Sequence, residues 1–227
     1  MDYPPFPGFR AEAFDFLRQL AANNDRDWFK PRKETYEDEV LWPFRCLVAD
    51  VTREAAAAGI PLAGDPQRSI FRIYRDTRFS KDKRPYKTHA GAFLTRTGER
   101  EVHGGGFYVH VEPGGCFMSA GYWRPETPML RRWRARMAAD PAAFLDVAER
   151  LAAAGLVLEC DGEELKRMPQ GFDVDPDAPI APYMRWKSFL ATRTVPDEAL
   201  TDPGFTHEVV RTMREALPLL DYGWELG

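Results

Sequence analysis

The sequence predicts an α+β protein, a single domain over residues 1–227 with a central, mainly antiparallel sheet and flanking N- and C-terminal helices. Apolar residues recur at helical spacing near both ends of the chain, whereas in the middle they alternate with polar residues. The alternation is clearest in residues 107–111, and the Pro-Gly-Gly turn at residues 113–115 predicts that this strand continues into an antiparallel hairpin.

The N-terminal part is predicted to be helical. Residues 11–22 carry apolar side chains at spacings of three, which indicates an amphipathic helix. A second helical pattern covers residues 31–58 and ends at Gly59, a common C-terminal stop. Pro43 lies inside this second pattern. Because proline lacks an amide hydrogen and clashes with the preceding turn, it predicts a kink or a split there.

The middle of the chain is predicted to form the sheet. Its strands are expected at residues 69–75, 88–96, 106–112 and 116–123.

Helices return after the sheet. A Thr-Pro and an Asp-Pro pair open predicted helices over residues 127–139 and 140–155, because both pairs combine a capping side chain with a first-turn proline. Residues 165–182 are rich in turn formers and are expected to be irregular. A strand over residues 187–195 and a helix over residues 203–217 complete the expected order.

The composition is ordinary for a globular protein, with 44% hydrophobic and 29% charged residues. No apolar run reaches the length of a membrane span, so no membrane partner is expected. Cys46, Cys116 and Cys160 are odd in number and widely spaced, which predicts neither a disulfide framework nor a zinc knuckle. We therefore expect a cytoplasmic protein.

Positive charge is concentrated in residues 67–100. This segment has ten basic and three acidic residues, a net charge of +7 in a chain whose total is -4. A folded protein seldom gathers so many like charges without an anionic partner or facing acids. Since predicted strands flank residues 75–87, we expect a long loop at one end of the sheet, where binding sites commonly lie.

The charged loop predicts an anion site. Arginine binds phosphate or carboxylate in a bidentate manner, and lysine adds a point charge. The candidate ligand-binding residues are Arg72, Arg75, Arg78, Lys81, Lys83 and Lys87. Asp76 is the candidate base or orienting group. An aspartate among arginines stays ionised, which suits positioning better than proton abstraction.

Trp123 and Arg124 end the predicted hairpin and precede a predicted helix. A helix N-terminus attracts anions, so both residues are further candidates for ligand binding, Trp123 by stacking. The alternative is that Trp123 belongs to the core and Arg124 is solvated.

His110 is the second candidate catalytic residue, as a general base on the strand face that it shares with Tyr108 and Glu112. A metal set of His103 and His110 with Glu101 or Glu112 is conceivable. Its spacing matches no recognised zinc pattern, so we expect no metal site and no cofactor.

Several of these blocks resemble a known family. The run Tyr-Arg-Asp-Thr-Arg-Phe-Ser-Lys-Asp-Lys-Arg-Pro-Tyr-Lys-Thr at residues 74–88 is similar to the signature of an uncharacterised bacterial and fungal family, domain of unknown function twenty-four sixty-one. Later blocks resemble it at residues 106–114, 121–125 and 165–172 and around the Lys-Ser-Phe run that begins at Lys187. The resemblance covers nearly the whole chain and implies a single α+β domain, but no activity.

Members of that family often carry a His-Pro pair after the Gly-Phe-Asp block. Asp175 and Pro176 stand at that place here, so no histidine role is inferred there.

Three functional interpretations remain open. The first is binding of a phosphorylated or otherwise anionic small molecule at the charged loop, with acid-base or phosphoryl chemistry on it. The second is a noncatalytic module that binds an acidic protein surface or a nucleic acid backbone. The third is a purely structural network of ion pairs.

Overall fold

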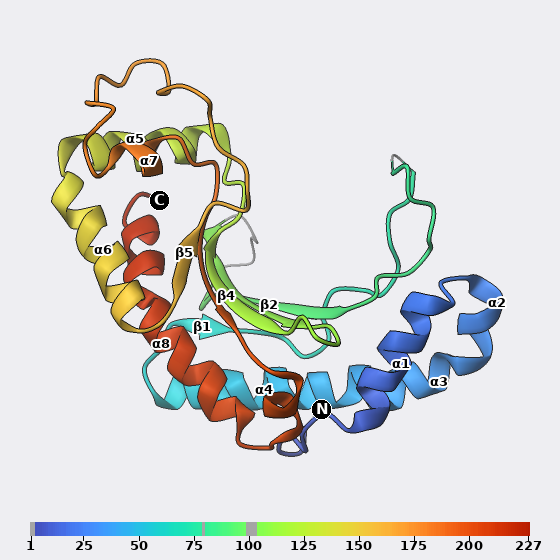
Figure 1. Ribbon diagram of the computed structural model, residues 1–227. Helices are drawn as coiled ribbons and strands as arrows, with labels where there is room; N and C mark the ends of the chain where they lie inside the picture. The colour runs from blue at the N-terminus through green and yellow to red at the C-terminus, as the bar shows by residue number, and fades with distance from the viewer. Residues whose placement is uncertain (1–2, 79, 99–103) are drawn as a thin grey trace. The chain divides into compact units, whose positions relative to one another are not determined.

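The computed structural model describes residues 3–78, 80–98 and 104–227 and confirms the α+β class (Figure 1). One six-stranded antiparallel sheet has the strand order β1-β2-β3-β4-β6-β5, and in the chain most helices precede or follow its central strands. The strands are β1 (Leu62–Ala63), β2 (Ala90–Arg96), β3 (Gly106–Val111), β4 (Phe117–Tyr122), β5 (Val157–Glu159) and β6 (Phe189–Thr194).

Helices account for most of the remaining regular structure. The α-helices are α1 (Ala11–Ala22), α2 (Arg26–Phe29), α3 (Lys33–Thr35), α4 (Trp42–Ala57), α5 (Thr127–Ala139), α6 (Pro141–Ala153), α7 (Ala181–Met184) and α8 (Phe205–Trp224). Further helical segments of the described residues are η1 (Lys30–Arg32), the π-helical η2 (Tyr36–Leu41) and η4 (Asp197–Thr201). Within the described ranges, no helix combines the length and the apolarity needed to cross a membrane.

The predicted strand at residues 69–75 is wrong. This segment forms only two isolated bridges, one from Ile70 to Ala92 of β2 and one from Tyr74 to Tyr86. It changes pairing partner halfway along, so no continuous ladder forms. The other three central strands end within two residues of their predicted bounds.

Two prolines lie in helical parts of the chain. The predicted split at Pro43 is confirmed, because the π-helical η2 ends at Leu41 and α4 begins at Trp42, which places Pro43 in the first turn of α4, where its missing amide hydrogen is not needed. The last helix does not end at residue 217, since α8 continues through Pro218 to Trp224. The buried Leu219 and Leu220 provide the packing that maintains the helix beyond the proline.

Contacts between residues divide the chain into two compact units. Unit 1 comprises Met1–Leu94, Tyr108–Met118 and Thr194–Arg211, and unit 2 comprises Thr95–Phe107, Ser119–Arg193 and Thr212–Gly227. The expectation of a single domain over residues 1–227 stays a prediction.

Each unit has its own aromatic core. In unit 1 the ring of Phe9 packs edge-on against Phe44, with their centroids 5.8 Å apart, and both side chains are buried. In unit 2 the fully buried Trp133 stacks on Phe189 at 4.2 Å and 8°. Figure 1 shows α1, α2 and α3 gathered near one end of α4 in unit 1.

Candidate functional site

The charged segment folds as a closed loop within unit 1. We call residues 75–87 the basic loop. Tyr74 and Tyr86 form an antiparallel bridge at its base, and the backbone N–H of Arg75 donates to the carbonyl of Pro85 at 2.9 Å. The loop therefore begins and ends at one short ladder, as in a hairpin.

Asn24 fixes the base of the loop to the N-terminal helices. Its Nδ2 donates to the carbonyl oxygen of Tyr86, and its Oδ1 accepts from the N–H of Tyr86, both at 3.0 Å. One side chain thus supplies both hydrogen bonds that a neighbouring strand would make to this residue. It holds the loop beside α2.

Ion pairs inside the loop engage its arginines. Asp82 accepts from Arg75 at 2.6 Å and from Arg84 at 2.7 Å. The hydrogen bonds from Arg84 and then from Arg75 hold the pKa of the Asp82 carboxyl well below its usual range. These two arginines are therefore already neutralised in part by a local acid.

The candidate base Asp76 is engaged in the same way. Its carboxylate accepts from Nε and Nη2 of Arg78, the shorter contact being 2.7 Å, and from the Arg78 N–H. These bonds lower the pKa of Asp76, so the group is ionised at neutral pH. Lys83 donates to the carbonyl of Thr77 at 2.9 Å. An anion arriving here competes with these partners.

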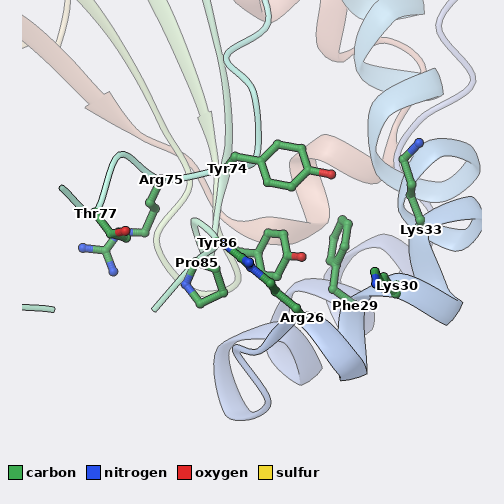
Figure 2. A pocket seen from close by; sticks show the side chains of 9 residues that line it. All are labelled: Arg26, Phe29, Lys30, Lys33, Tyr74, Arg75, Thr77, Pro85 and Tyr86. Carbon is green, nitrogen blue, oxygen red and sulfur yellow. The ribbon is translucent and has the colours of Figure 1, made fainter. Parts of the chain in front are cut away.

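A pocket of about 390 Å³ lies between the loop and the N-terminal helices (Figure 2). Its lining residues are Arg26, Phe29, Lys30, Lys33, Tyr74, Arg75, Thr77, Pro85 and Tyr86. Four of them are cationic, three are aromatic and none is acidic. The pocket is therefore electropositive and offers flat apolar surfaces.

The aromatic residues form one wall of the pocket. The rings of Phe29 and Tyr86 stack with centroids 4.2 Å apart at 23°, and Tyr74 lies 5.4 Å from Tyr86. Figure 2 shows these three rings between the loop residues and the helical residues. Tyr74 keeps 47% of its surface exposed, so part of this wall is open to a ligand.

The sequence reasoning missed the cations that come from the N-terminal segment. Arg26, Lys30 and Lys33 are spaced by four and three positions, which places them on one face of a helical path. That spacing was the available signal. Among the described residues, Arg26 and Lys30 have no ion-pair partner, whereas Lys33 pairs with Glu37 at 3.1 Å.

The other predicted cations lie at different places. Arg75 lines the pocket, while Arg72 lines a neighbouring pocket of about 240 Å³ together with Arg45. Lys87 points its Nζ at the ring of Phe71, 5.1 Å from the centroid, and burial lowers its pKa. Lys81 is exposed and lines neither pocket.

Trp123 and Arg124 belong to unit 2, whereas the basic loop belongs to unit 1. Trp123 is 58% exposed, so it is not a core residue, and its Nε1 donates to Asp161 at 2.8 Å. Arg124 pairs with Glu163 and lies over the Trp123 ring at 5.0 Å. Their contribution to ligand binding stays a prediction.

His110 lies in a hydrogen-bonded series on one face of β3. Its Nε2 lies 3.1 Å from Oε2 of Glu112, and its Nδ1 lies 2.9 Å from the hydroxyl of Tyr108. Because a carboxylate only accepts, Nε2 carries the proton in the neutral ring and Nδ1 accepts from Tyr108. His103 and Glu101, the other residues of the conceivable metal set, lie outside the described residues.

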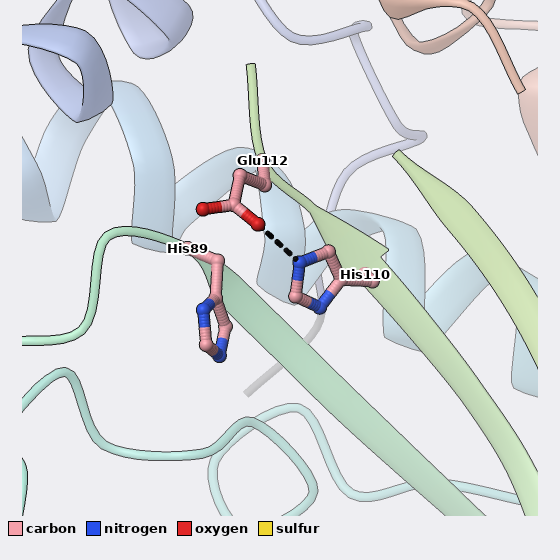
Figure 3. Close-up of side chains that lie close together, drawn as sticks. All are labelled: His89, His110 and Glu112. Atoms are coloured by element: carbon pink, nitrogen blue, oxygen red, sulfur yellow. Dashed lines mark hydrogen bonds and ion pairs between the residues drawn. The ribbon is translucent and has the colours of Figure 1, made fainter. Parts of the chain in front are cut away.

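His89 lies beside this series (Figure 3). Its ring centroid is 4.4 Å from that of His110, and one ligand atom from each of His89, His110 and Glu112 lies within 4.8 Å of the others. Burial lowers the pKa of His110 and lowers that of His89 to about 4. Both rings are therefore neutral at pH 7.

Residues 12–222 match the model of a family described as conserved hypothetical protein (DUF2461). No curated protein and no solved structure matches the chain. The match covers both compact units and includes the basic loop and the histidines. The chain therefore belongs to the family of conserved hypothetical proteins DUF2461.

Proposed function

We propose that the chain binds a phosphorylated or otherwise anionic small molecule in the pocket beside the basic loop. The observation that carries the proposal is the lining of this pocket, which has four cationic side chains, three aromatic rings and no acid. Its volume of about 390 Å³ falls in the range typical of small-molecule sites.

The lining indicates what the ligand would look like. Arg26 and Lys30, which have no acidic partner among the described residues, would bind its anionic group by charge-assisted hydrogen bonds. Tyr74, which is 47% exposed, would stack on a planar part of it. An anionic group attached to a ring, as in a nucleotide, fits both halves of this surface.

Chemistry on the bound ligand is a second step of the proposal. Fixed cations would stabilise negative charge that develops during acid-base or phosphoryl chemistry. Asp76 is ionised and bonded to Arg78, which suits orientation of the ligand or of Arg78 better than proton abstraction. The proposed function is therefore ligand binding, and no reaction is assigned to the pocket.

Two rival functions make different predictions. The ion pairs of Asp82 with Arg75 and Arg84 support a structural role for part of the loop. A noncatalytic module for a nucleic acid backbone or an acidic protein would bind broadly and with a steep dependence on salt.

We also propose that the protein is located in the cytoplasm. The three free cysteines support this location.

The test is calorimetry and thermal unfolding with inorganic phosphate, AMP and a short single-stranded oligonucleotide, at low and at moderate salt. We expect AMP to bind selectively and, at a hundred times its Kd, to stabilise the chain by about 2.7 kcal/mol. Arg26→Ala should weaken AMP binding roughly tenfold or more, since a charged hydrogen bond contributes about 1.5–3 kcal/mol.

Arg18→Ala is the matched control, because Arg18 lies on the neighbouring α1, pairs with Asp15 and does not line the pocket. It should bind AMP like the parent chain. Binding of the oligonucleotide alone, lost at moderate salt, would support the noncatalytic module instead. Absence of any binding, together with a much lower melting temperature for Arg75→Ala, would leave the structural role.

A further inference from the structure

We propose that His89, His110 and Glu112 bind a divalent transition-metal ion, such as Zn²⁺, beside strand β3. None of these residues lines the anion pocket, so the site is independent of the proposed function. The proposal rests on the proximity of the three side chains, since one ligand atom of each lies within 4.8 Å of the others. Figure 3 shows the three side chains together.

The local fold brings the three residues together. Side chains two positions apart point to the same side of a strand, which places His110 and Glu112 together at the end of β3. His89 directly precedes β2, the neighbour of β3 in the sheet. Sequence spacing alone does not show this convergence, because it depends on the pairing of two strands.

The donor set suits a transition metal. Two imidazole nitrogens and one carboxylate oxygen are the protein ligands of many catalytic zinc sites and of non-haem iron sites. Three protein ligands leave a coordination position open for water or a substrate.

A second layer of hydrogen bonds holds two of the ligands. Thr88 Oγ1 donates to Oε1 of Glu112 at 3.0 Å, and the Tyr108 hydroxyl lies 2.9 Å from Nδ1 of His110. These bonds engage the outer atoms and leave Nε2 of His110 facing Oε2 of Glu112. Metal-binding histidines and carboxylates characteristically have such supporting partners.

Metal binding requires a change of tautomer in His110. Its proton moves from Nε2 to Nδ1, where it is donated to the Tyr108 oxygen, and the Nε2 lone pair turns to the metal. Glu112 stays ionised throughout. The metal ion therefore takes the place of the proton that now lies between His110 and Glu112.

The distances between the ligand atoms fit a zinc ion once His89 moves closer to the other two residues. Tetrahedral zinc brings its ligand atoms to about 3.3 Å from one another, and Nε2 of His110 already lies 3.1 Å from Oε2 of Glu112. His89 has to approach. Its side chain is half-buried against the ring of His110 and makes no hydrogen bond among the described residues, so its rotation towards the other two ligands breaks none.

The surroundings fix the ring of His110. Phe117 stacks on it at 4.5 Å and 16°, and only 8% of His110 is exposed. Tyr108 packs over Gly91 so closely that a Cβ there would lie 2.3 Å from the hydroxyl oxygen. The ligand nitrogen is thus held by packing as well as by hydrogen bonds.

The test uses the full chain without an affinity tag, stripped with EDTA. Co²⁺ is followed by its visible absorption, and Zn²⁺ by calorimetry. We expect one equivalent of either ion. His89→Ala and Glu112→Gln should each weaken binding at least tenfold, and Tyr108→Phe should weaken it about tenfold through the lost support of His110. Glu112→Gln keeps the shape of the side chain, so its effect is not one of misfolding.

His207→Ala is the matched control. His207 also pairs with a glutamate, since its Nδ1 lies 2.9 Å from Glu54, but it does so on the exposed surface of the same unit. This variant should bind Co²⁺ like the parent chain. The proposal is overturned if the parent binds neither ion, or if cobalt absorption persists unchanged in His89→Ala and Glu112→Gln.

Discussion

Asp82 illustrates how a single carboxylate can organise the basic loop. It accepts from both Arg75 and Arg84, and both contacts are open to solvent in part. Exposed ion pairs contribute little each, but here one acid pairs with two arginines and offsets their mutual repulsion. The hydrogen bonds from Arg84 and Arg75 lower the pKa of the Asp82 carboxyl.

We expect Asp82→Asn to lower the melting temperature at pH 7. The sign follows from the lowered pKa: the ionised carboxylate stabilises the fold above the unfolded value of about 4, and this contribution fades as the pH falls below it. The gap between the parent and the variant should therefore narrow from pH 5 to pH 3, as measured by thermal unfolding. A gap independent of pH would show that the charge of Asp82 is not the cause.

At the residue scale the sequence predicted part of the site. The density of positive charge in the sequence predicted the basic loop and Arg75 as a site residue, because local composition can be read without knowledge of the fold. It did not lead to Arg26 or Lys30, whose place in the pocket depends on the contact between a helix and a distant loop. It also missed His89, because the neighbouring position of β2 and β3 decides what that ring meets.

At the element scale, the position of the basic loop depends on Asn24. This residue lies between α1 and α2, and its side chain makes two hydrogen bonds to the backbone of Tyr86. Such a contact joins two elements more than sixty residues apart through one amide group. The pocket wall therefore depends on a residue that does not line it.

Asn24→Ala should destabilise the chain by about 1–3 kcal/mol, because it leaves two half-buried backbone groups of Tyr86 without their partner. Asn23→Ala is the neighbouring control. Its Nδ2 donates to the carbonyl of Gln19 at an exposed helix end, so less than about 1 kcal/mol should be lost. Urea unfolding measures both changes. Equal losses in the two variants would contradict this role of Asn24.

Elements were predictable where their pattern was long enough. Helix α1 has its predicted bounds, since twelve residues show a clear apolar face. Strands β1 and β5, with two and three residues, are too short to show alternation and were missed. The segment 69–75 has strand-like composition, but it divides its hydrogen bonds between two partners.

At the scale of the whole molecule, each compact unit is built from three separate segments of the chain. In unit 1 the N–H of Phe9 donates to the carbonyl of Leu200, and that of Val195 donates to the carbonyl of Cys116, both within 3.0 Å. Phe205 is also buried. The segment Thr194–Arg211 is therefore an integral part of unit 1.

We expect a fragment of residues 1–118 to lack a cooperative thermal transition. It omits the last segment of unit 1, and each buried apolar side chain removed from that unit takes away about 1.5–3 kcal/mol. Circular dichroism during heating measures the transition, with the full chain as the reference. A sharp melt of the fragment would mean that residues 1–118 suffice for a stable fold.

The same segmentation has a consequence for synthesis on the ribosome. Unit 1 is complete only when Arg211 has been added, long after Leu94. At about 5–20 residues per second, translation of the intervening chain takes roughly 6 to 23 s. During that interval the nascent aromatic core of unit 1 lacks its final segment, so the growing chain is exposed to chaperones for about half of its synthesis.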